Sequence, residues 1–389
     1  MPSIFSPDTL HYGAGAFERL GEEAARFGSR ALLVGDRTME MLGLINRARI
    51  LLEDAGVECS SFIDVDGEPE DRHVKAALAI AREYDCRMLV GLGGGSCIDA
   101  AKAVALLAAS GGDIADYLDP RQHPGAVALP LIAVPTTAGT GSEGTDVTVI
   151  TDTERGIKMM IKRAALMPAV AIVDPELARS APGPVVAATG VDALTHAIEA
   201  YLSRRAHPYT DTLALAACAR IGRHLERAWR DREDLDAWSE LSLGATQAGQ
   251  AFSNASVGLV HGMSRPLGAL FHVPHGISNA MLLPGVLEFS RRDCAPRLAE
   301  LAAVLLPGEC PRDIDAAADA VVAWVKRLCL SLEIPNMQRY GIEWEALAPR
   351  LDKMAEDALA SGSPGNNPRI PSHAEIITLY RHCYADDFG

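Results

Sequence analysis

The first half of the chain alternates short apolar runs with amphipathic segments long enough to form helices. Strands joined by crossovers of helical length lie parallel, with helices covering both faces of the sheet. The pattern therefore predicts an α/β domain with a Rossmann-like parallel sheet. Its strands are expected at residues 31–35, 58–63, 87–92, 131–134 and 170–173, its helices at 45–54, 70–84 and 97–109, and a hairpin at 147–149 and 156–161.

The pattern changes at Pro182 and Pro184. Long Ala- and Leu-rich segments follow, and β-branched runs nearly disappear. Proline interrupts regular structure, and 389 residues suffice for two hydrophobic cores, so we place a domain boundary here. The prediction is an α/β domain at residues 1–182 followed by an all-α domain at residues 183–389.

Charge and cysteine content exclude several classes of protein. A formal net charge of −15 without a Lys/Arg-rich block argues against a nucleic-acid partner. No apolar run approaches the roughly 18 residues of a membrane-spanning helix, and the N-terminus does not resemble a secretory signal. The eight cysteines form no CxxC pair, which is typical of reduced thiols. We expect a cytoplasmic protein that has no membrane association and acts on a small molecule.

Three consecutive glycines join the strand at 87–92 to the following helix. Gly93, Gly94 and Gly95 would let a phosphate approach the backbone, and Ser96 begins a helix whose unpaired amides attract anions. The loop is not the G-x-G-x-x-G fingerprint of the usual dinucleotide turn. It favours a diphosphate-binding loop, with a tight turn that binds nothing as the alternative.

Two further features fit a dinucleotide. Asp36 ends the strand at 31–35, where a carboxylate would accept hydrogen bonds from a ribose and repel a 2′-phosphate, which favours NAD over NADP. The alternative is a helix N-cap. Thr136, Thr137 and Thr140 lie in the loop at 135–143 and suit contact with adenine or phosphates, unless the loop only satisfies its own backbone.

Asp192 and His196 lie four positions apart in a helical run, which places both on one helix face. A carboxylate and an imidazole in this arrangement suit a divalent metal. The alternative is a first-turn acid near the helix dipole and a histidine on an exposed face. His261 and His275 fall in the same half of the chain, each before a glycine that we expect to leave room for something close by. Together the four would hold a divalent ion and leave a net positive charge that attracts an alkoxide.

Four blocks resemble those of the iron-containing, or group III, alcohol dehydrogenases, in the same order. They are GGGSxxDxxK at 93–102, PTTAGTGSE at 135–143, GxDALxHAxEA at 190–200, and HG at 261–262 with PHG at 274–276. The resemblance implies a nucleotide-binding α/β domain followed by a helical metal-binding domain, the dehydroquinate-synthase-like fold. It also implies a homodimer or larger homo-oligomer.

The same resemblance implies individual roles. The metal ligands would be Asp192, His196, His261 and His275, with Fe²⁺ expected and Zn²⁺ as an alternative. Contacts to NAD(P) are expected from Asp36, Gly94, Gly95, Ser96, Thr136, Thr137, Thr145 and Lys158. Gly93 in the glycine loop and Thr140 in the loop at 135–143 are expected to contribute to the same cofactor site.

One position departs from the family pattern. Members similar to small-diol dehydrogenases carry a second histidine four residues after the first histidine of the His-Gly block, and Arg265 stands there in this chain. Arginine cannot shuttle protons near neutral pH but binds anions bidentately. One hypothesis is an anionic semialdehyde substrate held by Arg265; the other is an Arg265 that pairs with a nearby acid. Phe252 and Phe271 are expected on the apolar side of the pocket.

The expected activity is reversible hydride transfer between NAD(P) and a small primary alcohol or aldehyde, assisted by the metal. One alternative is a lyase similar to dehydroquinate synthase, although those sites resemble one Glu and two His rather than one Asp and three His. The other alternative is a non-catalytic protein that binds NAD and metal on the same scaffold.

Overall fold

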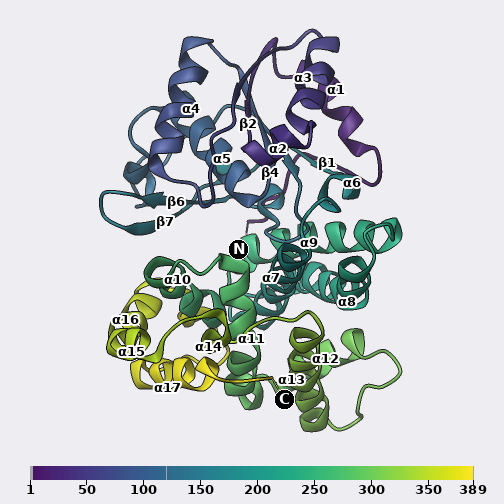
Figure 1. The fold of residues 1–389 in the computed structure, drawn as a ribbon, viewed down its shortest axis with the longest axis vertical. Coiled ribbons are helices and arrows are strands. Elements are labelled where there is room, and N and C mark those ends of the chain that lie inside the picture. Colours follow the sequence, from purple (N-terminus) through teal and green to yellow (C-terminus); the bar gives the residue numbers. More distant parts are fainter. Residues whose placement is uncertain (1–2, 120, 389) are drawn as a thin grey trace. The chain divides into compact units, whose positions relative to one another are not determined.

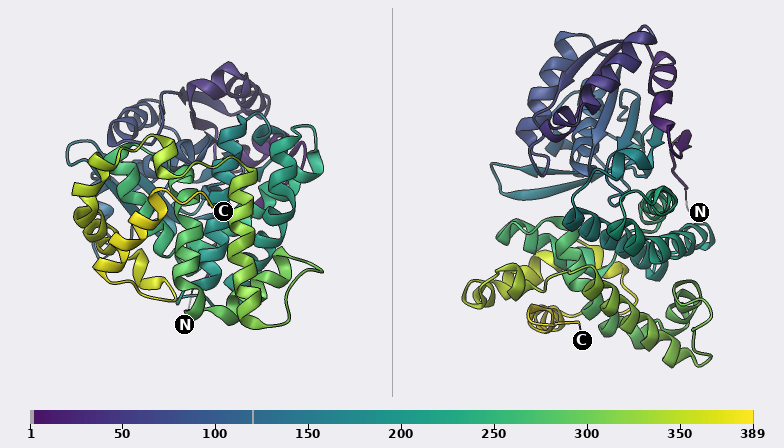
Figure 2. Two further views of the ribbon diagram at one scale, coloured as in Figure 1. Left: turned by 60° about the horizontal axis from the view of Figure 1, so that its bottom comes forward. Right: turned by 45° about the vertical axis from the view of Figure 1, so that its right-hand side comes forward.

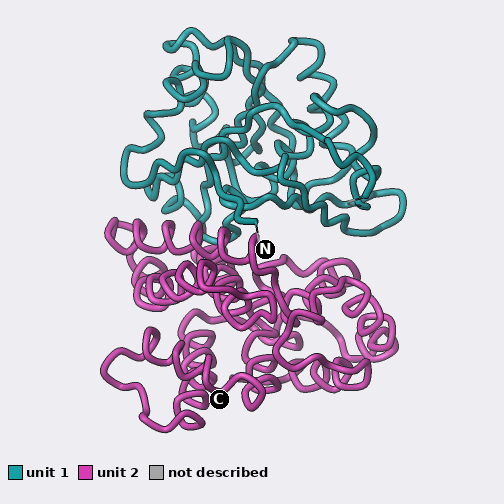
Figure 3. The backbone as a smooth tube through the Cα atoms, turned by 180° about the vertical axis from the view of Figure 1, so that it is seen from behind, with its two compact units in different colours: residues 1–181 teal, residues 182–389 magenta. Residues whose placement is uncertain are grey.

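The computed structural model describes residues 3–119 and 121–388. The chain divides into two compact units, Met1–Ala181 and Pro182–Gly389, coloured separately in Figure 3. The units meet between residues 181 and 182, one residue before the boundary predicted between residues 182 and 183.

The first unit is built on a six-stranded sheet in which every neighbouring pair is parallel (Figure 1). The predicted α/β domain is thus confirmed. The edge strand β1 was not predicted, because its side chains are half-buried or exposed and carry no apolar run. In sheet order the strands are β1 (Thr9–Tyr12), β8 (Val170–Val173), β5 (Leu131–Pro135), β4 (Met88–Gly93), β2 (Arg30–Val34) and β3 (Glu58–Phe62).

Helices cover both sheet faces, because side chains alternate along each strand. On β2, Leu32 and Val34 pack with residues of α4 and α5, whereas Ala31 and Leu33 pack on the other face with residues of α1 and α3. The helices are α1 (Leu20–Ala25), α2 (Arg37–Met41), α3 (Leu44–Asp54), α4 (Asp71–Glu83), α5 (Gly95–Ser110) and α6 (Pro175–Ala178), and the predicted hairpin is β6 (Val147–Asp152) with β7 (Ile157–Lys162).

The strand order reverses between β2 and β4. From β2 the chain moves outward to β3, then returns to β4 on the other side of β2 and continues to β5. At such a switch point, the connections after two adjacent strands diverge and leave a crevice at their carboxyl ends, which is the usual ligand site of open α/β sheets. Asp36 follows β2, and Gly93 ends β4.

The second unit is helical throughout its described residues, 182–388, as Figure 2 shows. Its central helix α7 (Gly183–Leu202) begins at the predicted break, with Pro182 as N-cap and Pro184 in the first turn. The longer helices that follow are α8 (Pro208–Arg230), α9 (Leu235–Ala255), α10 (Leu259–Phe271), α11 (His275–Ser290), α12 (Ala295–Leu305), α13 (Ile314–Ser331), α16 (Leu351–Ala360) and α17 (His373–Tyr384), with short α14 (Met337–Tyr340) and α15 (Trp344–Leu347).

Helix α7 is buried on all sides, which identifies it as the core of this unit. It packs closely on α8 because Gly190 has no side chain: a Cβ there would lie 2.1 Å from Leu225 Cδ1. Among the described residues, no helix combines the length and apolar character needed to cross a bilayer.

Candidate functional site

The four predicted metal ligands lie together in the helical unit. Asp192 and His196 come from α7, His261 from α10, and His275 is the first residue of α11. One donor atom from each side chain lies within 4.8 Å of the others, and Asp192 Oδ1 is 3.8 Å from His196 Nε2 and 3.7 Å from His261 Nε2. All are buried except His275, which is half-buried. One carboxylate and three imidazoles in a buried cluster fit a divalent first-row metal.

The glycines that follow His261 and His275 leave room for close neighbours, as the sequence predicted, and atoms of other segments occupy that room. A Cβ on Gly262 would lie 2.7 Å from Pro364 Cγ, and one on Gly276 would lie 2.9 Å from the Ala188 carbonyl oxygen of α7. Real Cβ atoms do not approach this closely. Gly276 therefore lets the start of α11 pack closely on α7, and Gly262 lets α10 pack closely on the segment at Pro364.

A carboxylate behind the cluster sets the tautomer of His261. Glu199 Oε2 lies 2.6 Å from His261 Nδ1 and accepts from Gly258 N at 2.9 Å, and its Oε1 accepts from Val260 N at 2.6 Å. A carboxylate only accepts, so Nδ1 carries the proton and Nε2 presents a lone pair to the cluster. No role for Glu199 was predicted from the sequence, although it lies on the same face of α7 as Asp192 and His196.

We predict that Glu199→Gln weakens metal binding about 10- to 100-fold, the usual effect of losing a group that orients a ligand. Glutamine keeps the shape of the glutamate side chain. Its NH₂ group, however, would have to face one of the three N–H donors that Glu199 now accepts from, on Gly258, Val260 and His261. The dissociation constant is measured by competition with a chelator. Glu226→Gln, which alters a surface pair with Arg230, is the control. Equal affinities for the three proteins would show that Glu199 does not support His261.

The amide of Asn279 is the second group missed by the sequence argument. Its Nδ2 lies 2.7 Å from Asp192 Oδ1, 3.1 Å from His261 Nε2 and 3.2 Å from His275 Nε2. Its Oδ1 is buried and has no hydrogen-bond partner among the described residues. The sequence feature that could have revealed Asn279 is its position four residues after His275, which places both side chains on one face of α11.

Of the two aromatic residues expected at the pocket, Phe252 contacts a predicted ligand. Its ring stacks on the His196 imidazole, with centroids 4.3 Å apart and planes 20° apart. Phe271 lies at the end of α10, where the Arg350 guanidinium lies 5.9 Å from the ring centroid. Phe252 thus covers one face of the His196 ring.

Arg265 is half-buried on α10, one turn after His261. Burial lowers the pKa of its guanidinium, and attraction to the Glu199 carboxylate works against that shift. Arginine stays charged at neutral pH even so. A fixed positive charge therefore lies close to the ligand cluster.

In the first unit, the glycine loop packs against the threonine loop. Gly93 has φ +151°, and a Cβ there would lie 2.5 Å from Cys97 Sγ. A Cβ on Gly95 would lie 2.8 Å from Thr140 Cγ2. Gly94 precedes α5, and no described side chain caps the helix there. The exposed amides at this helix start fit a phosphate group.

Asp36 is the N-cap of α2, because its Oδ1 accepts a hydrogen bond from Met39 N at 2.9 Å. The N-cap was one of the two roles proposed for Asp36 from the sequence. Its Oδ2 accepts from Cys97 Sγ at 3.4 Å, which brings the carboxylate to the glycine loop. Asp36 therefore lies at the strand-order switch point. Contact with a ribose remains a prediction.

A buried lysine organises the threonine loop. Lys102 Nζ, on α5, donates to the main-chain carbonyl oxygens of Ser142, Thr145 and Val147 at 2.7–2.9 Å. It also lies 3.1 Å from the Ser142 hydroxyl and 2.8 Å from the Thr145 hydroxyl. Burial lowers the pKa of Lys102 to about 8, so the side chain is still largely protonated at neutral pH. Asp99, one turn earlier, accepts from Ser142 Oγ at 2.6 Å. Motif residues 99 and 102 thus hold the loop in place.

The remaining predicted cofactor residues differ in their surroundings. Thr136 donates its amide to Gly93 O at 2.9 Å, and Thr137 and Ser96 are half-buried. Thr145 is buried, with its hydroxyl bonded to Lys102. Lys158, on β7, pairs with Glu68 at 2.6 Å. Contact with the cofactor remains a prediction for all of these residues.

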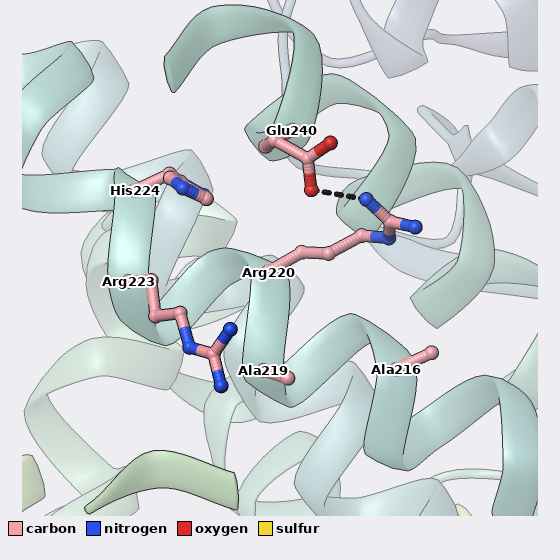
Figure 4. Close-up of a pocket in the computed structure, with 6 residues that line it drawn as sticks. All are labelled: Ala216, Ala219, Arg220, Arg223, His224 and Glu240. Carbon is pink, nitrogen blue, oxygen red and sulfur yellow. Dashed lines mark hydrogen bonds and ion pairs between the residues drawn. The ribbon is translucent and has the colours of Figure 1, made fainter. Parts of the chain in front are cut away.

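A surface pocket of about 240 Å³ lies elsewhere, on α8 and α9 (Figure 4). None of the predicted site residues lines it. Arg220 is paired with Glu240 and Gln247, so its charge is already neutralised. We assign this pocket no part in the chemistry.

Two family models match the chain: iron-containing alcohol dehydrogenase over residues 7–175, and the C-terminal region of the Fe-containing alcohol dehydrogenase family over 186–384. The chain is 35% identical to the 1,3-propanediol dehydrogenase of Klebsiella pneumoniae, over 97% of both chains. It is similar to the crystal structure of a 1,3-propanediol oxidoreductase, with a TM-score of 0.93, 34% identity and coverage of 99% of this chain and 100% of that one.

A third similar protein has its cofactor in place. The sulfoacetaldehyde reductase of Bifidobacterium kashiwanohense, in complex with NAD⁺, is 27% identical, with a TM-score of 0.86 and coverage of 100% of both chains. The family uses NAD and iron, and the donor cluster of this chain fits the metal. The chain therefore belongs to the iron-containing alcohol dehydrogenase family and is a metal-dependent, NAD-linked oxidoreductase.

Proposed function

We propose that Asp192, His196, His261 and His275 bind the catalytic metal, with which the chain interconverts a small primary alcohol and its aldehyde. The observation that carries this proposal is the convergence of the four donor atoms within 4.8 Å in the core of the helical unit. A divalent ion there would keep one net positive charge, because only Asp192 is anionic. Fe²⁺ is the expected ion and Zn²⁺ the alternative.

The chemistry divides between cofactors and chain. When bound, the metal would act as a Lewis acid toward the substrate oxygen, and NAD would accept or return the hydride. Glu199 keeps the proton on His261 Nδ1, so that Nε2 stays a donor atom. Phe252 covers the His196 ring and limits water access on that side.

For the dinucleotide, we propose that Gly93, Gly94, Gly95 and Ser96 bind the diphosphate at the start of α5. Thr136, Thr137 and Thr140 would line the adjoining loop, with Thr145 and Lys158 as further contacts. The Asp36 carboxylate at the switch point would accept from the ribose hydroxyls and repel a 2′-phosphate. NAD is therefore favoured over NADP.

For the substrate, we propose an aldehyde that carries an anionic group bound by Arg265. Two observations support it: the half-buried charge one turn from His261, and the likeness to a reductase named for sulfoacetaldehyde. The likeness to enzymes named for 1,3-propanediol, a neutral diol, makes a neutral substrate the second candidate.

A test of this choice compares Arg265→Ala with the wild type on two aldehydes of equal chain length, one ending in a carboxylate and one neutral. A charge-assisted hydrogen bond contributes about 1.5–3 kcal/mol, so kcat/KM for the anionic aldehyde should fall about 10- to 100-fold. The neutral aldehyde should be nearly unaffected. Arg339→Ala, at an exposed pair with Asp387, is the control. Similar losses on both aldehydes would refute the anionic substrate.

The overall reaction is tested by following NADH absorbance with metal-reconstituted protein and a panel of aldehydes. Turnover that requires both metal and aldehyde is the expected result. Tight NAD binding without turnover of any aldehyde would favour the non-catalytic alternative. The lyase alternative lacks support, because the matching family consists of alcohol dehydrogenases.

We infer further that the chain works in the cytoplasm, since all eight cysteines are free and six of them are buried. A homodimer or larger homo-oligomer is proposed from the family resemblance alone.

A further inference from the structure

The position of Asn279 bears directly on how the cluster accepts a cation. Its side chain is fully buried, one turn after His275 on α11. Its Nδ2 lies 2.7–3.2 Å from donor atoms of Asp192, His261 and His275, three of the four proposed ligands. The amide nitrogen is therefore close to the position that a shared cation would take.

The amide nitrogen uses the lone pairs that a metal needs. Glu199 fixes the proton of His261 on Nδ1, which leaves Nε2 as an acceptor, and the Asp192 carboxylate only accepts. An N–H group and a cation cannot share one lone pair. An imidazole nitrogen has only one lone pair, so metal binding through His261 Nε2 must move the Asn279 N–H away from that atom.

The surroundings limit how that movement takes place. Asn279 has no exposed surface, and close packing leaves little room for the whole side chain to swing out. A half-turn about the Cβ–Cγ bond needs no extra room, because it only exchanges the amide nitrogen and oxygen. It would bring Oδ1, now buried without a partner among the described residues, toward the cluster. Carboxamide oxygens coordinate divalent cations.

We propose that Asn279 is an additional member of the metal site. Its NH₂ group, with two hydrogens shared among three neighbouring acceptors, holds the ligands together before the cation binds, and its oxygen turns to face the cation afterwards. This inference rests on the proposed function, because it assumes that Asp192, His196, His261 and His275 bind metal. It adds a residue that both tunes affinity and prepares the site for the ion.

The test uses Co²⁺ as a spectroscopic probe in the full-length protein, with affinity measured by chelator competition. The wild type should bind one ion per chain. Asn279→Ala should bind about 10- to 100-fold more weakly and give a different visible spectrum, because a coordinating oxygen is lost. Asn336→Ala is the matched control: Asn336 is also buried and hydrogen-bonded, but to Asp387 and the start of α14. It should lower stability without changing affinity or spectrum.

A second variant keeps the test valid if Asn279→Ala does not fold. Asn279→Asp adds an anionic donor, so the Co²⁺ affinity should rise about tenfold or more. With chelator present, its melting temperature should fall below that of the wild type, since two carboxylates then face each other near 2.7 Å.

The outcomes separate the two proposals. A wild-type protein that binds no metal would overturn the proposed function and this inference with it. A wild type that binds normally, with an Asn279→Ala variant of equal or higher affinity and an unchanged spectrum, would overturn the inference alone. For Asn279→Asp, an affinity and spectrum equal to those of the wild type would do the same.

Discussion

Asp192→Asn is expected to leave a folded protein that loses its metal and about 10³-fold of its activity, since a metal ion contributes several kcal/mol of transition-state stabilisation. Asp192 is the only anionic member of the proposed ligand set, and its Oδ1 lies 3.7–3.8 Å from the donor nitrogens of His261 and His196. Asparagine keeps the size of the side chain but removes the charge that balances a divalent cation. The buried position of Asp192, at 1% exposure, means that water cannot replace that charge.

The measurements are metal content after dialysis and kcat with NADH and an aldehyde. Asp319→Asn is the control, because its carboxylate pairs with Arg291 on the surface and should contribute little. Wild-type metal content and activity in Asp192→Asn would refute the assignment of Asp192 as a ligand. Loss of activity with full metal content would show that Asp192 contributes to catalysis but is not needed to bind the metal.

Lys102→Met is expected to lower the free energy of unfolding by about 3–5 kcal/mol, the range seen when one partner of a buried charged group is removed. Five oxygens lie within 3.1 Å of the Lys102 ammonium, three of them main-chain carbonyls. Methionine fills the same volume but donates no hydrogen bond, so the loop from Ser142 to Val147 loses its anchor to α5. The dissociation constant for NAD should rise about tenfold or more, equivalent to 1.4 kcal/mol.

Urea unfolding and NAD titration at neutral pH check both parts of this prediction. Lys353→Met is the control, because Lys353 forms an exposed i,i+4 pair with Asp357 and should cost about 0.5 kcal/mol or less. A Lys102→Met protein as stable as this control would contradict the anchoring role. A large loss of stability with unchanged NAD affinity would separate the anchor from the cofactor site.

The sequence allowed most of the fold to be predicted, because each buried strand carries a continuous apolar run and each helix its own periodicity. Strands β2, β4, β5 and β8 begin or end within two residues of the expected ranges. β1 was missed because an edge strand with half-exposed side chains has no such run. The strand order, and with it the switch point beside Asp36 and Gly93, depends on pairing that no local pattern contains.

The residues of the candidate site likewise fall into those that the sequence could predict and those that it could not. Asp192 and His196 could be paired from their spacing on one helix. His261 and His275 could be proposed from their place before glycines in the same half of the chain, and the family resemblance implied the same four residues. Glu199 and Asn279 were missed because the partners that reveal their roles, His261 for Glu199 and Asp192 and His261 for Asn279, come from other helices. The glycines at 262 and 276 leave the room that was predicted, but the sequence could not show which atoms fill it, since those atoms belong to distant segments.

Anomalous X-ray scattering at the iron absorption edge, from crystals of Fe²⁺-loaded protein, tests the central claim most directly. The account predicts one strong peak per chain, about 2.0–2.2 Å from the carboxylate of Asp192 and from one ring nitrogen each of His196, His261 and His275. A peak bound by other side chains, or an ordered cluster of these four residues with no peak in loaded protein, would contradict it.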